Sequence, residues 1–490
     1  MNLPNVRHAP LNAPSQRNLR HSKGMAPTTL TFVGAAGTVT GSKHLLTVDS
    51  PRGERRILID SGLYQGEKKL RRKNWSDFPV PADSISDILL THAHLDHVGY
   101  LPRLVKQGFS GTIWATPSTI DLAHIVLRDS AYLQERDAEH ARTYGYSKHR
   151  RPLPLYTVND VEDTLPLMRA VDFDADIDVG GQVSAHWTRA GHILGSASIR
   201  VHTPGGDALF SGDLGRPTHP VLRSREIPEG APTVLLESTY GDREHFETDP
   251  GHEKHEVFRD AICRTIDRGG SVLVPAFAVD RTEVVLKVLS DMVAAGQIPS
   301  VPIYVDSPMA LASLRLYQAV SARGELNDEV GGLKLSNLNL IEVRDQEQSQ
   351  KLNDPKEPSI IVSASGMLTG GRVLHHIEHM LPQAIHTVVL TGYQAVGTRG
   401  RALLDGAREL KMHGAWVSVQ AEVIRDEEFS VHADCSELVD WVRDLVPQPR
   451  SVWCVHGEDK AAQALVESLD QELGVRARVA VPEKTIELKK

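Results

Sequence analysis

Short apolar runs that end in polar side chains recur along the first half of the chain and predict the strands of a sheet. The runs at 57–59, 88–90 and 208–210 each lead within a few residues to Asp or His. Further strands are expected at 185–187 and 197–202, and helical periodicity extends from about 119 to 141. The pattern therefore places Asp and His, two residue types that commonly bind metal ions, at the ends of predicted strands.

The pattern changes in the middle of the chain. Aliphatic runs at 270–275, 303–306, 360–363 and 387–390 alternate with helical stretches. Such alternation is typical of a parallel α/β unit. Strand–loop–helix units with more histidine return after about residue 429.

Composition narrows the class of protein. The chain has 490 residues, a formal net charge of −9 and three widely spaced cysteines, Cys263, Cys435 and Cys454. The cysteines form no CxxC pair, which fits a reducing compartment, and no apolar stretch is long enough to cross a membrane. We therefore expect a cytoplasmic protein without a membrane partner. The polar segment 1–27 has no apolar core of a signal peptide and is predicted to be disordered.

The densest chemical signal is the segment Thr91-His92-Ala93-His94-Leu95-Asp96-His97. On an extended strand end His92 and His94 point to the same side, as two ligands of one metal require, and Asp96 and His97 can turn toward a second ion. The alternative is a polar turn that is rich in histidine by chance. Four titratable groups beside a buried strand would be costly without compensation, so we favour a metal site.

Two later positions extend the series. His192 lies among small residues that allow the backbone to approach a crowded centre, and Asp213 lies between Gly212 and Leu214-Gly215 after an apolar run. A single histidine or aspartate in such a turn is usually structural, but the ordered series favours a binuclear hydrolase. A carboxylate can bridge two cations through its two oxygens, so Asp213 is the expected bridging ligand.

The series resembles the metallo-β-lactamase fold, an αββα sandwich with metals at the sheet edge. The motifs around Glu237, His432 and His456, and those at 274–279, 363–371 and 392–394, resemble the β-CASP subfamily. That subfamily includes cleavage and polyadenylation endonucleases and their bacterial and archaeal relatives. The resemblance begins at about Thr28 and implies an α/β fold class with four parts: an N-terminal extension at 1–27, a core at 28–241, an inserted β-CASP domain at 242–430 and the rest of the core at 431–490.

The resemblance implies two zinc ions per chain, because imidazole-rich ligation suits Zn²⁺. One would be held by His92, His94 and His192, the other by Asp96, His97 and His456, with Asp213 as the bridge. Asp60 and Asp434 are the expected carboxylates that orient ligand imidazoles.

The resemblance also implies the catalytic and substrate-binding groups. Glu237 would orient His432, which would protonate the leaving oxygen. Asp96 is expected to be a catalytic residue as well as a metal ligand. Backbone N–H groups of Ser365 and Gly366 would contact a phosphate, and the side chains of Arg281 and Arg372 would add positive charge. Relatives commonly have glycine before Arg281; Asp280 stands there in this chain, and we expect it to weaken nucleic-acid binding or to shift its preference.

The function expected is a zinc-dependent ribonuclease that cuts single-stranded RNA internally and leaves 5′-phosphate and 3′-hydroxyl ends. Histidine at position 456 is similar to RNA-acting members of the subfamily and favours RNA over DNA. The alternatives are a 5′-3′ exoribonuclease, a metallo-hydrolase of small esters, lactones or thioesters, and a scaffold or RNA-binding subunit without activity. The partners expected are single-stranded RNA and, as an alternative assembly, a second copy of the chain in a homodimer.

Overall fold

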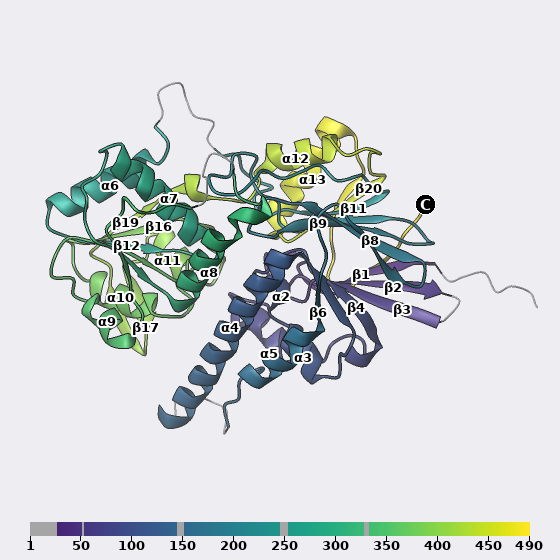
Figure 1. Cartoon of the computed structure of the whole chain (residues 1–490), viewed down its shortest axis with the longest axis horizontal. Coiled ribbons are helices and arrows are strands. Elements are labelled where there is room, and N and C mark those ends of the chain that lie inside the picture. The colour runs from purple at the N-terminus through teal and green to yellow at the C-terminus, as the bar shows by residue number, and fades with distance from the viewer. Residues whose placement is uncertain (1–26, 51–52, 145–150, 246–252, 328–332) are drawn as a thin grey trace, which may run out of the picture.

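The computed structural model describes residues 27–50, 53–144, 151–245, 253–327 and 333–490 (Figure 1). The expectation of a disordered extension at 1–27 falls almost wholly outside these residues. Among the helices of the described ranges, none combines the length and apolar character that crossing a membrane requires.

Two seven-stranded sheets are built from the two ends of the chain. The first has the order β22-β1-β2-β3-β4-β5-β6, and the second β21-β20-β11-β10-β9-β8-β7. The strands of the first sheet are β1 (Thr29–Phe32), β2 (His44–Ser50), β3 (Gly53–Ile59), β4 (Ile85–Leu89), β5 (Thr112–Ala115), β6 (Met168–Ala170) and β22 (Thr485–Glu487). Those of the second are β7 (Asp176–Gly180), β8 (Val183–Arg189), β9 (Ala197–His202), β10 (Ala208–Phe210), β11 (Thr233–Glu237), β20 (Ser451–Val455) and β21 (Ala477–Val479).

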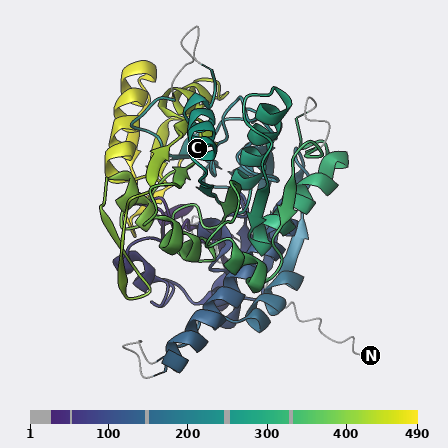
Figure 2. The same ribbon diagram turned by 90° about the vertical axis from the view of Figure 1, so that its left-hand side faces the viewer.

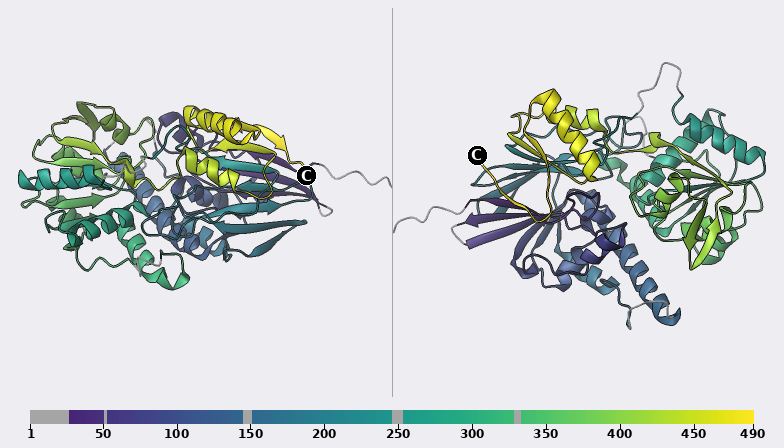
Figure 3. Two further views of the ribbon diagram at one scale, coloured as in Figure 1. Left: turned by 90° about the horizontal axis from the view of Figure 1, so that it is seen from above. Right: turned by 180° about the vertical axis from the view of Figure 1, so that it is seen from behind.

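The two sheets pack face to face through an apolar layer that includes Leu46, Ile57, Trp187 and Ile199. Side chains alternate across each strand, and the opposite faces also carry apolar residues, such as Leu58 and Ile88 of the first sheet and Val234 and Leu236 of the second, which must be covered. Helices α2 (Leu95–Val98), α3 (Leu101–Lys106), α4 (Pro117–Tyr144) and α5 (Val158–Thr164) cover the first sheet, and α12 (Cys435–Arg443) and α13 (Asp459–Leu473) cover the second. The right-hand view of Figure 3 shows these four layers. The αββα sandwich expected from the sequence is confirmed.

A second body lies beside the sandwich (Figures 1 and 2). Its sheet is parallel throughout, in the order β14-β13-β15-β12-β16-β19. The strands are β12 (Val272–Pro275), β13 (Ile303–Asp306), β14 (Leu340–Glu342), β15 (Ile360–Ser363), β16 (Thr387–Leu390) and β19 (Glu422–Arg425). Helices α6 (Glu256–Asp267), α7 (Arg281–Ala294), α8 (Pro308–Ala319), α9 (Gln346–Lys351), α10 (Val373–Met380) and α11 (Arg399–Leu404) surround it, and β17 (Glu409–Met412) and β18 (Ala415–Ser418) form a hairpin.

The apolar core continues from the sandwich into this insert. Helix α4 of the sandwich packs against α8, and one buried cluster contains side chains from both bodies. Strand β11 of the second sheet precedes the insert, and β20, which pairs with β11 in parallel, follows it. The insert is therefore attached at the edge of the sandwich where β11 ends. The precise boundaries 242 and 430 stay a prediction.

Candidate metal centre and catalytic groups

His92 and His94 lie in the loop after β4, whereas Asp96 and His97 lie in the short helix α2. Strand β4 ends at Leu89, and α2 begins at Leu95, directly after His94. The backbone N–H groups of Ser42 and Ser61 bind the carbonyl oxygens of Asp96 and His97 at 2.8 and 2.7 Å. A Cβ atom at Gly62 would lie 1.5 Å from the Asp96 carbonyl oxygen, so this close approach requires glycine.

Four donor atoms converge in a first group. His94 Nδ1 lies 3.2 Å from His92 Nε2 and 3.3 Å from His192 Nε2. Asp213 Oδ2 lies 3.6 Å from His92 Nε2 and 3.7 Å from His192 Nε2. Donors bound at about 2.0–2.2 Å to one tetrahedral zinc ion are roughly 3.3–3.6 Å apart. The spacing therefore fits one such ion.

A second group uses the other oxygen of the same carboxylate. Asp213 Oδ1 lies 3.4 Å from His97 Nε2 and 3.4 Å from His456 Nδ1. His456 Nε2 lies 3.2 Å from Asp96 Oδ2. Asp96, His97 and His456 form one potential metal cluster, and Asp213 faces both groups with different oxygens. This is the arrangement that a bridging carboxylate requires.

Buried atoms without partners support a fit to metal ions. Within the described residues His97 Nε2 and Asp213 Oδ1 are buried and accept or donate no hydrogen bond. His92 and His192 are fully buried, and burial lowers the pKa of both well below the usual value, with neighbouring histidines adding to the effect. Burial likewise lowers the pKa of His94 to about 4. Neutral imidazoles are the form that binds a metal, and unpaired buried polar atoms are costly otherwise.

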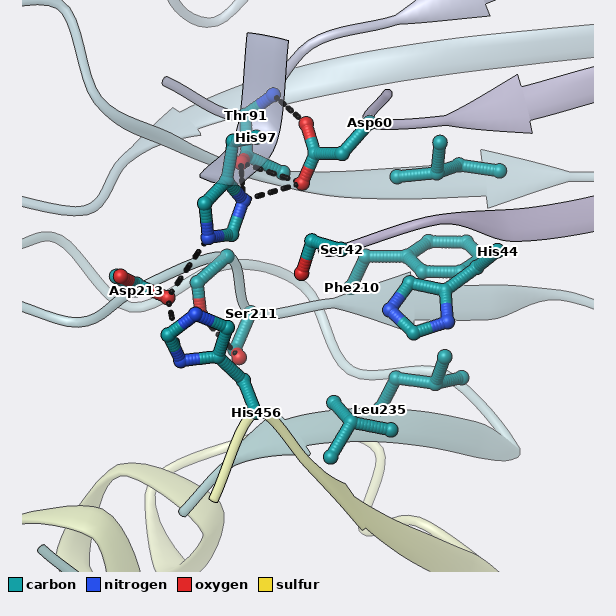
Figure 4. A pocket seen from close by; sticks show the side chains of 13 residues that line it. Ser42, His44, Asp60, Thr91, His97, Phe210, Ser211, Asp213, Leu235 and His456 are labelled. Carbon is teal, nitrogen blue, oxygen red and sulfur yellow. Dashed lines mark hydrogen bonds and ion pairs between the residues drawn. The ribbon is translucent and has the colours of Figure 1, made fainter. Parts of the chain in front are cut away.

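Asp60 binds the ligand candidate His97 at the ring nitrogen that faces away from Asp213. Its Oδ2 lies 2.8 Å from His97 Nδ1 and accepts a hydrogen bond from Thr91 Oγ1 at 2.8 Å, while its Oδ1 accepts from the Thr91 N–H at 2.8 Å (Figure 4). Burial would lower the pKa of His97, but the carboxylates of Asp213 and Asp60 raise it well above the usual value. With Nδ1–H directed at Asp60, Nε2 faces Asp213, as a ligand nitrogen should.

Asp434 does not have the corresponding role. Its side chain accepts the Glu437 N–H at 2.9 Å and caps the N-terminus of α12, and it also accepts the His245 N–H at 2.9 Å. No ligand imidazole lies among these bonds. We expected Asp434 to orient a metal ligand, but in the structure its side chain caps helix α12. Such a cap commonly contributes about 1 kcal/mol to stability.

His432 and Glu237 meet beside the first metal group. His432 Nδ1 lies 3.3 Å from Glu237 Oε2, and the His432 ring lies 4.3 Å from the His192 ring, centroid to centroid. Glu237 is fully buried and accepts the Leu214 N–H at 2.5 Å. The His432 side chain remains 16% exposed. The His432 imidazole therefore contacts a buried carboxylate through Nδ1 and remains accessible to solvent beside the first group of metal-ligand candidates.

Thr239 is a site residue that we did not predict. Its hydroxyl donates to Glu237 Oε2 at 2.6 Å and lies 3.2 Å from His456 Nδ1. It therefore connects the carboxylate that contacts His432 with a metal-ligand candidate. Its position two residues after Glu237, within the same motif, is the only sequence signal for it.

The four candidates for phosphate binding differ in how far other groups of the insert already bind them. Ser365 lies in the loop between β15 and α10, and its Oγ lies 3.0 Å from Thr369 Oγ1. The Gly366 carbonyl accepts from Gln394 Nε2 at 3.0 Å. The two arginines are engaged within the insert: Arg281 is 5% exposed and donates to the Thr391 carbonyl, and Arg372 Nη1 lies 2.7 Å from Asp306 Oδ1. Both side chains are thus bound by groups of the insert, so the structure does not support either arginine as a phosphate contact.

Three family models match the chain in order. Residues 47–252 match the metallo-beta-lactamase superfamily, 282–403 the Beta-Casp domain, and 416–481 the Zn-dependent metallo-hydrolase RNA specificity domain. The chain is 36% identical over 443 residues to Ribonuclease TTHA0252 of Thermus thermophilus, covering 88% of this chain and 94% of the relative. It is 31% identical over 481 residues to Transcription termination factor FttA of Methanosarcina mazei, covering 94% of this chain and 71% of that protein. The chain therefore belongs to the β-CASP subfamily of metallo-β-lactamase-fold, metal-dependent hydrolases.

Proposed function

We propose that this protein is a zinc-dependent endoribonuclease that hydrolyses single-stranded RNA and leaves 5′-phosphate and 3′-hydroxyl ends. The observation that carries the proposal is the convergence of seven donor side chains in two groups that share Asp213, next to the His432–Glu237 pair. The similarity to Ribonuclease TTHA0252 supports RNA as the substrate.

The proposed zinc ligands are the seven side chains of the two donor groups at the metal centre. His92, His94, His192 and Asp213 would hold one ion, and Asp96, His97, His456 and Asp213 the other. Bound there, two divalent cations would supply a water that ionises near neutral pH and charge compensation for the phosphate.

The chain's own residues would complete the reaction. When water oxygen bonds to phosphorus and the bond to the 3′ oxygen breaks, His432 would give its Nε2 proton to the leaving oxygen. The buried Glu237 carboxylate would hold Nδ1–H and so present Nε2 to the substrate. Thr239 would keep Glu237 in position.

The preference for RNA rests on the C-terminal part of the chain. The model described as an RNA specificity domain matches residues 416–481, which include His432 and His456. His456 also receives backbone support from the core, since its N–H donates to the Ala35 carbonyl at 2.7 Å. A ligand that belongs to this segment would couple substrate preference to the metal centre.

The test is incubation of metal-loaded protein with matched single-stranded RNA and DNA labelled at either end, at fixed salt, with both product ends mapped. Internal cuts in RNA with 5′-phosphate and 3′-hydroxyl ends are expected, and duplex RNA is expected to be a poor substrate. Stepwise release of nucleotides from the 5′ end would show that the protein is a 5′-3′ exoribonuclease rather than an endoribonuclease. DNA cleavage as fast as RNA cleavage would overturn the RNA assignment.

A further inference from the structure

Five cations stand together in the short helix α1 (Lys68–Lys73), whose six residues are KKLRRK. We call Lys68, Lys69, Arg71, Arg72 and Lys73 the basic helix. None of its side chains is buried, and no carboxylate within the described residues forms an ion pair with any of the five. In a chain with a net charge of −9, this unpaired positive surface is a local exception.

The basic helix is fixed to the core rather than loosely attached. The buried Asn74, which ends the helix, accepts the Tyr64 N–H with Oδ1 and donates to the Tyr64 carbonyl with Nδ2, both at 2.9 Å. The Tyr64 hydroxyl donates to the Val33 carbonyl at 3.2 Å, and the Gln65 N–H donates to Thr40 Oγ1 at 3.3 Å. These bonds hold the helix against the turn at 34–41, whose Ala35 carbonyl also binds the backbone of the metal-ligand candidate His456.

The basic helix lies where the core meets the insert. A Cβ at Gly397 of the insert would lie 3.0 Å from Glu67 Cγ, directly before α1. Arg399 follows in the insert and is partly exposed. Burial lowers its pKa, and the positive charge of Arg71 contributes in the same direction. Arg399 Nη1 donates to the Leu368 carbonyl at 3.1 Å, in the loop that also carries Ser365.

Aromatic and apolar side chains connect this junction with the catalytic pair. The Tyr240 ring lies 5.9 Å from the His432 ring and 5.9 Å from the Tyr393 ring, centroid to centroid. Tyr393 and Phe277 pack on a small cluster made by Val39, Met367 and Ala395, which joins core and insert. At the far end, Trp75 follows the basic helix and is 52% exposed.

We propose that the basic helix, Arg399 and Trp75 form a binding surface for the sugar–phosphate backbone and bases of single-stranded RNA outside the catalytic centre. This inference rests on the proposed ribonuclease function, and it adds the path that the RNA strand takes between the core and the insert. Unpaired cations beside exposed aromatic rings are how proteins bind single strands without reading sequence. The two polar flanks, Glu67 and Asp77, leave the helix with a clear excess of positive charge.

The test compares a variant of the basic helix with a control of equal charge change. Lys68→Gln/Lys69→Gln/Arg72→Gln removes three exposed cations and keeps a good helix former at each position. Arg476→Gln/Lys489→Gln/Lys490→Gln removes three exposed cations from the C-terminal part of the chain. The C-terminus lies on the side of the core away from the insert (Figure 1). All substituted side chains are exposed, so the thermal unfolding midpoint should stay near that of the parent protein.

Binding is measured by fluorescence anisotropy in a metal-loaded His432→Ala background with single-stranded RNA of about 20 nucleotides, longer than the site size of one module. The basic-helix variant should weaken binding roughly tenfold, and its slope of log affinity on log salt should fall by up to about 2, since each phosphate contact on a single strand contributes about 0.7. The control should change neither. Trp75→Ala should weaken binding with little change in the slope, because stacking carries no charge.

Cleavage kinetics separate this surface from the catalytic centre. With the long RNA the basic-helix variant should raise KM and leave kcat unchanged, whereas an RNA of about four nucleotides should be cut equally by variant and parent. If the parent protein cuts neither RNA, the ribonuclease proposal fails. If the parent cuts RNA and the basic-helix variant matches it in affinity, salt slope and KM, this surface serves another polyanion, such as an acidic protein, and the inference is overturned.

Discussion

The Asp280 carboxylate of the insert accepts a hydrogen bond from the Tyr317 hydroxyl at 2.9 Å, and that hydroxyl accepts one from the Leu194 N–H at 3.1 Å. The other oxygen of Asp280 lies 3.1 Å from His219 Nε2. Leu194 lies two residues after the ligand candidate His192. The insert therefore holds the loop that carries His192, and it also holds the segment that follows Asp213.

This pairing changes the expectation for Asp280. The side chain is 1% exposed and bound to Tyr317 and His219, so it does not repel a phosphate at the surface. Its backbone is strained, with φ 67° and ψ −54°, in a tight turn closed by the Arg281 N–H and the Val279 carbonyl at 2.9 Å. Glycine adopts that conformation without strain. In this chain the hydrogen bonds of the carboxylate offset the strain.

Tyr317→Phe should destabilise the protein by about 1–3 kcal/mol, because it leaves the buried Leu194 N–H without an acceptor. The free energy of unfolding from urea titration measures this. Tyr304→Phe is the matched control, since no hydrogen bond of the Tyr304 hydroxyl is present among the described residues. Equal stability of the two variants would show that the Leu194 N–H finds another partner.

Asp213→Ala should remove the metal ions and the hydrolytic activity together, because both groups lose the oxygen that they share. Elemental analysis of protein purified without chelator should give two zinc equivalents for the parent and fewer than one for the variant. Asp83→Ala, at an exposed position, should keep both. A single equivalent in the parent at full ligand occupancy would contradict a binuclear centre.

His432→Ala should keep both metal ions and slow the chemical step by roughly 10²–10⁴-fold, the usual contribution of general acid catalysis. A substrate with sulfur at the scissile 3′ position leaves without a proton and should restore much of the rate in His432→Ala but little in Asp213→Ala. The exposed His379→Ala serves as the control. Loss of zinc in His432→Ala would make His432 a ligand.

Glu237→Gln should slow the reaction less than His432→Ala. An amide oxygen can still accept the Leu214 N–H, which Glu237 Oε1 now accepts, and the imidazole remains present but less well oriented. Single-turnover rates over a pH series measure the effect. A rate loss as large as that of His432→Ala would mean that the negative charge itself, rather than the orientation, is required.

The contribution of Glu283 to the free energy of unfolding should fall as pH rises from about 5 to 8. Burial raises the pKa of this carboxyl to about 8, and Asp280 contributes in the same direction. The folded state therefore binds a proton that the unfolded chain releases, and this contribution is lost as pH rises through the folded pKa. Glu283→Gln should remove this contribution from the pH dependence of the unfolding free energy, and the exposed Glu139→Gln should leave that dependence unchanged.

The sequence by itself determined the order of strands and helices and the residues that converge at the centre. A strand that ends in a ligand side chain is a local pattern, and chain order brings such ends to one edge of the sandwich. Asp60 was expected to orient a ligand imidazole, and its bond to His97 agrees with that expectation.

Only the tertiary structure decided the partner of each remaining polar side chain. Asp434 follows a histidine motif but caps a helix, and Arg281 follows a loop motif but is buried against Thr391. The link from Asp280 to Leu194 spans the insert and the core, and so does the close approach of Gly397 to Glu67. A local pattern shows which side chain is polar, but packing between distant segments decides which group it meets and whether water reaches it.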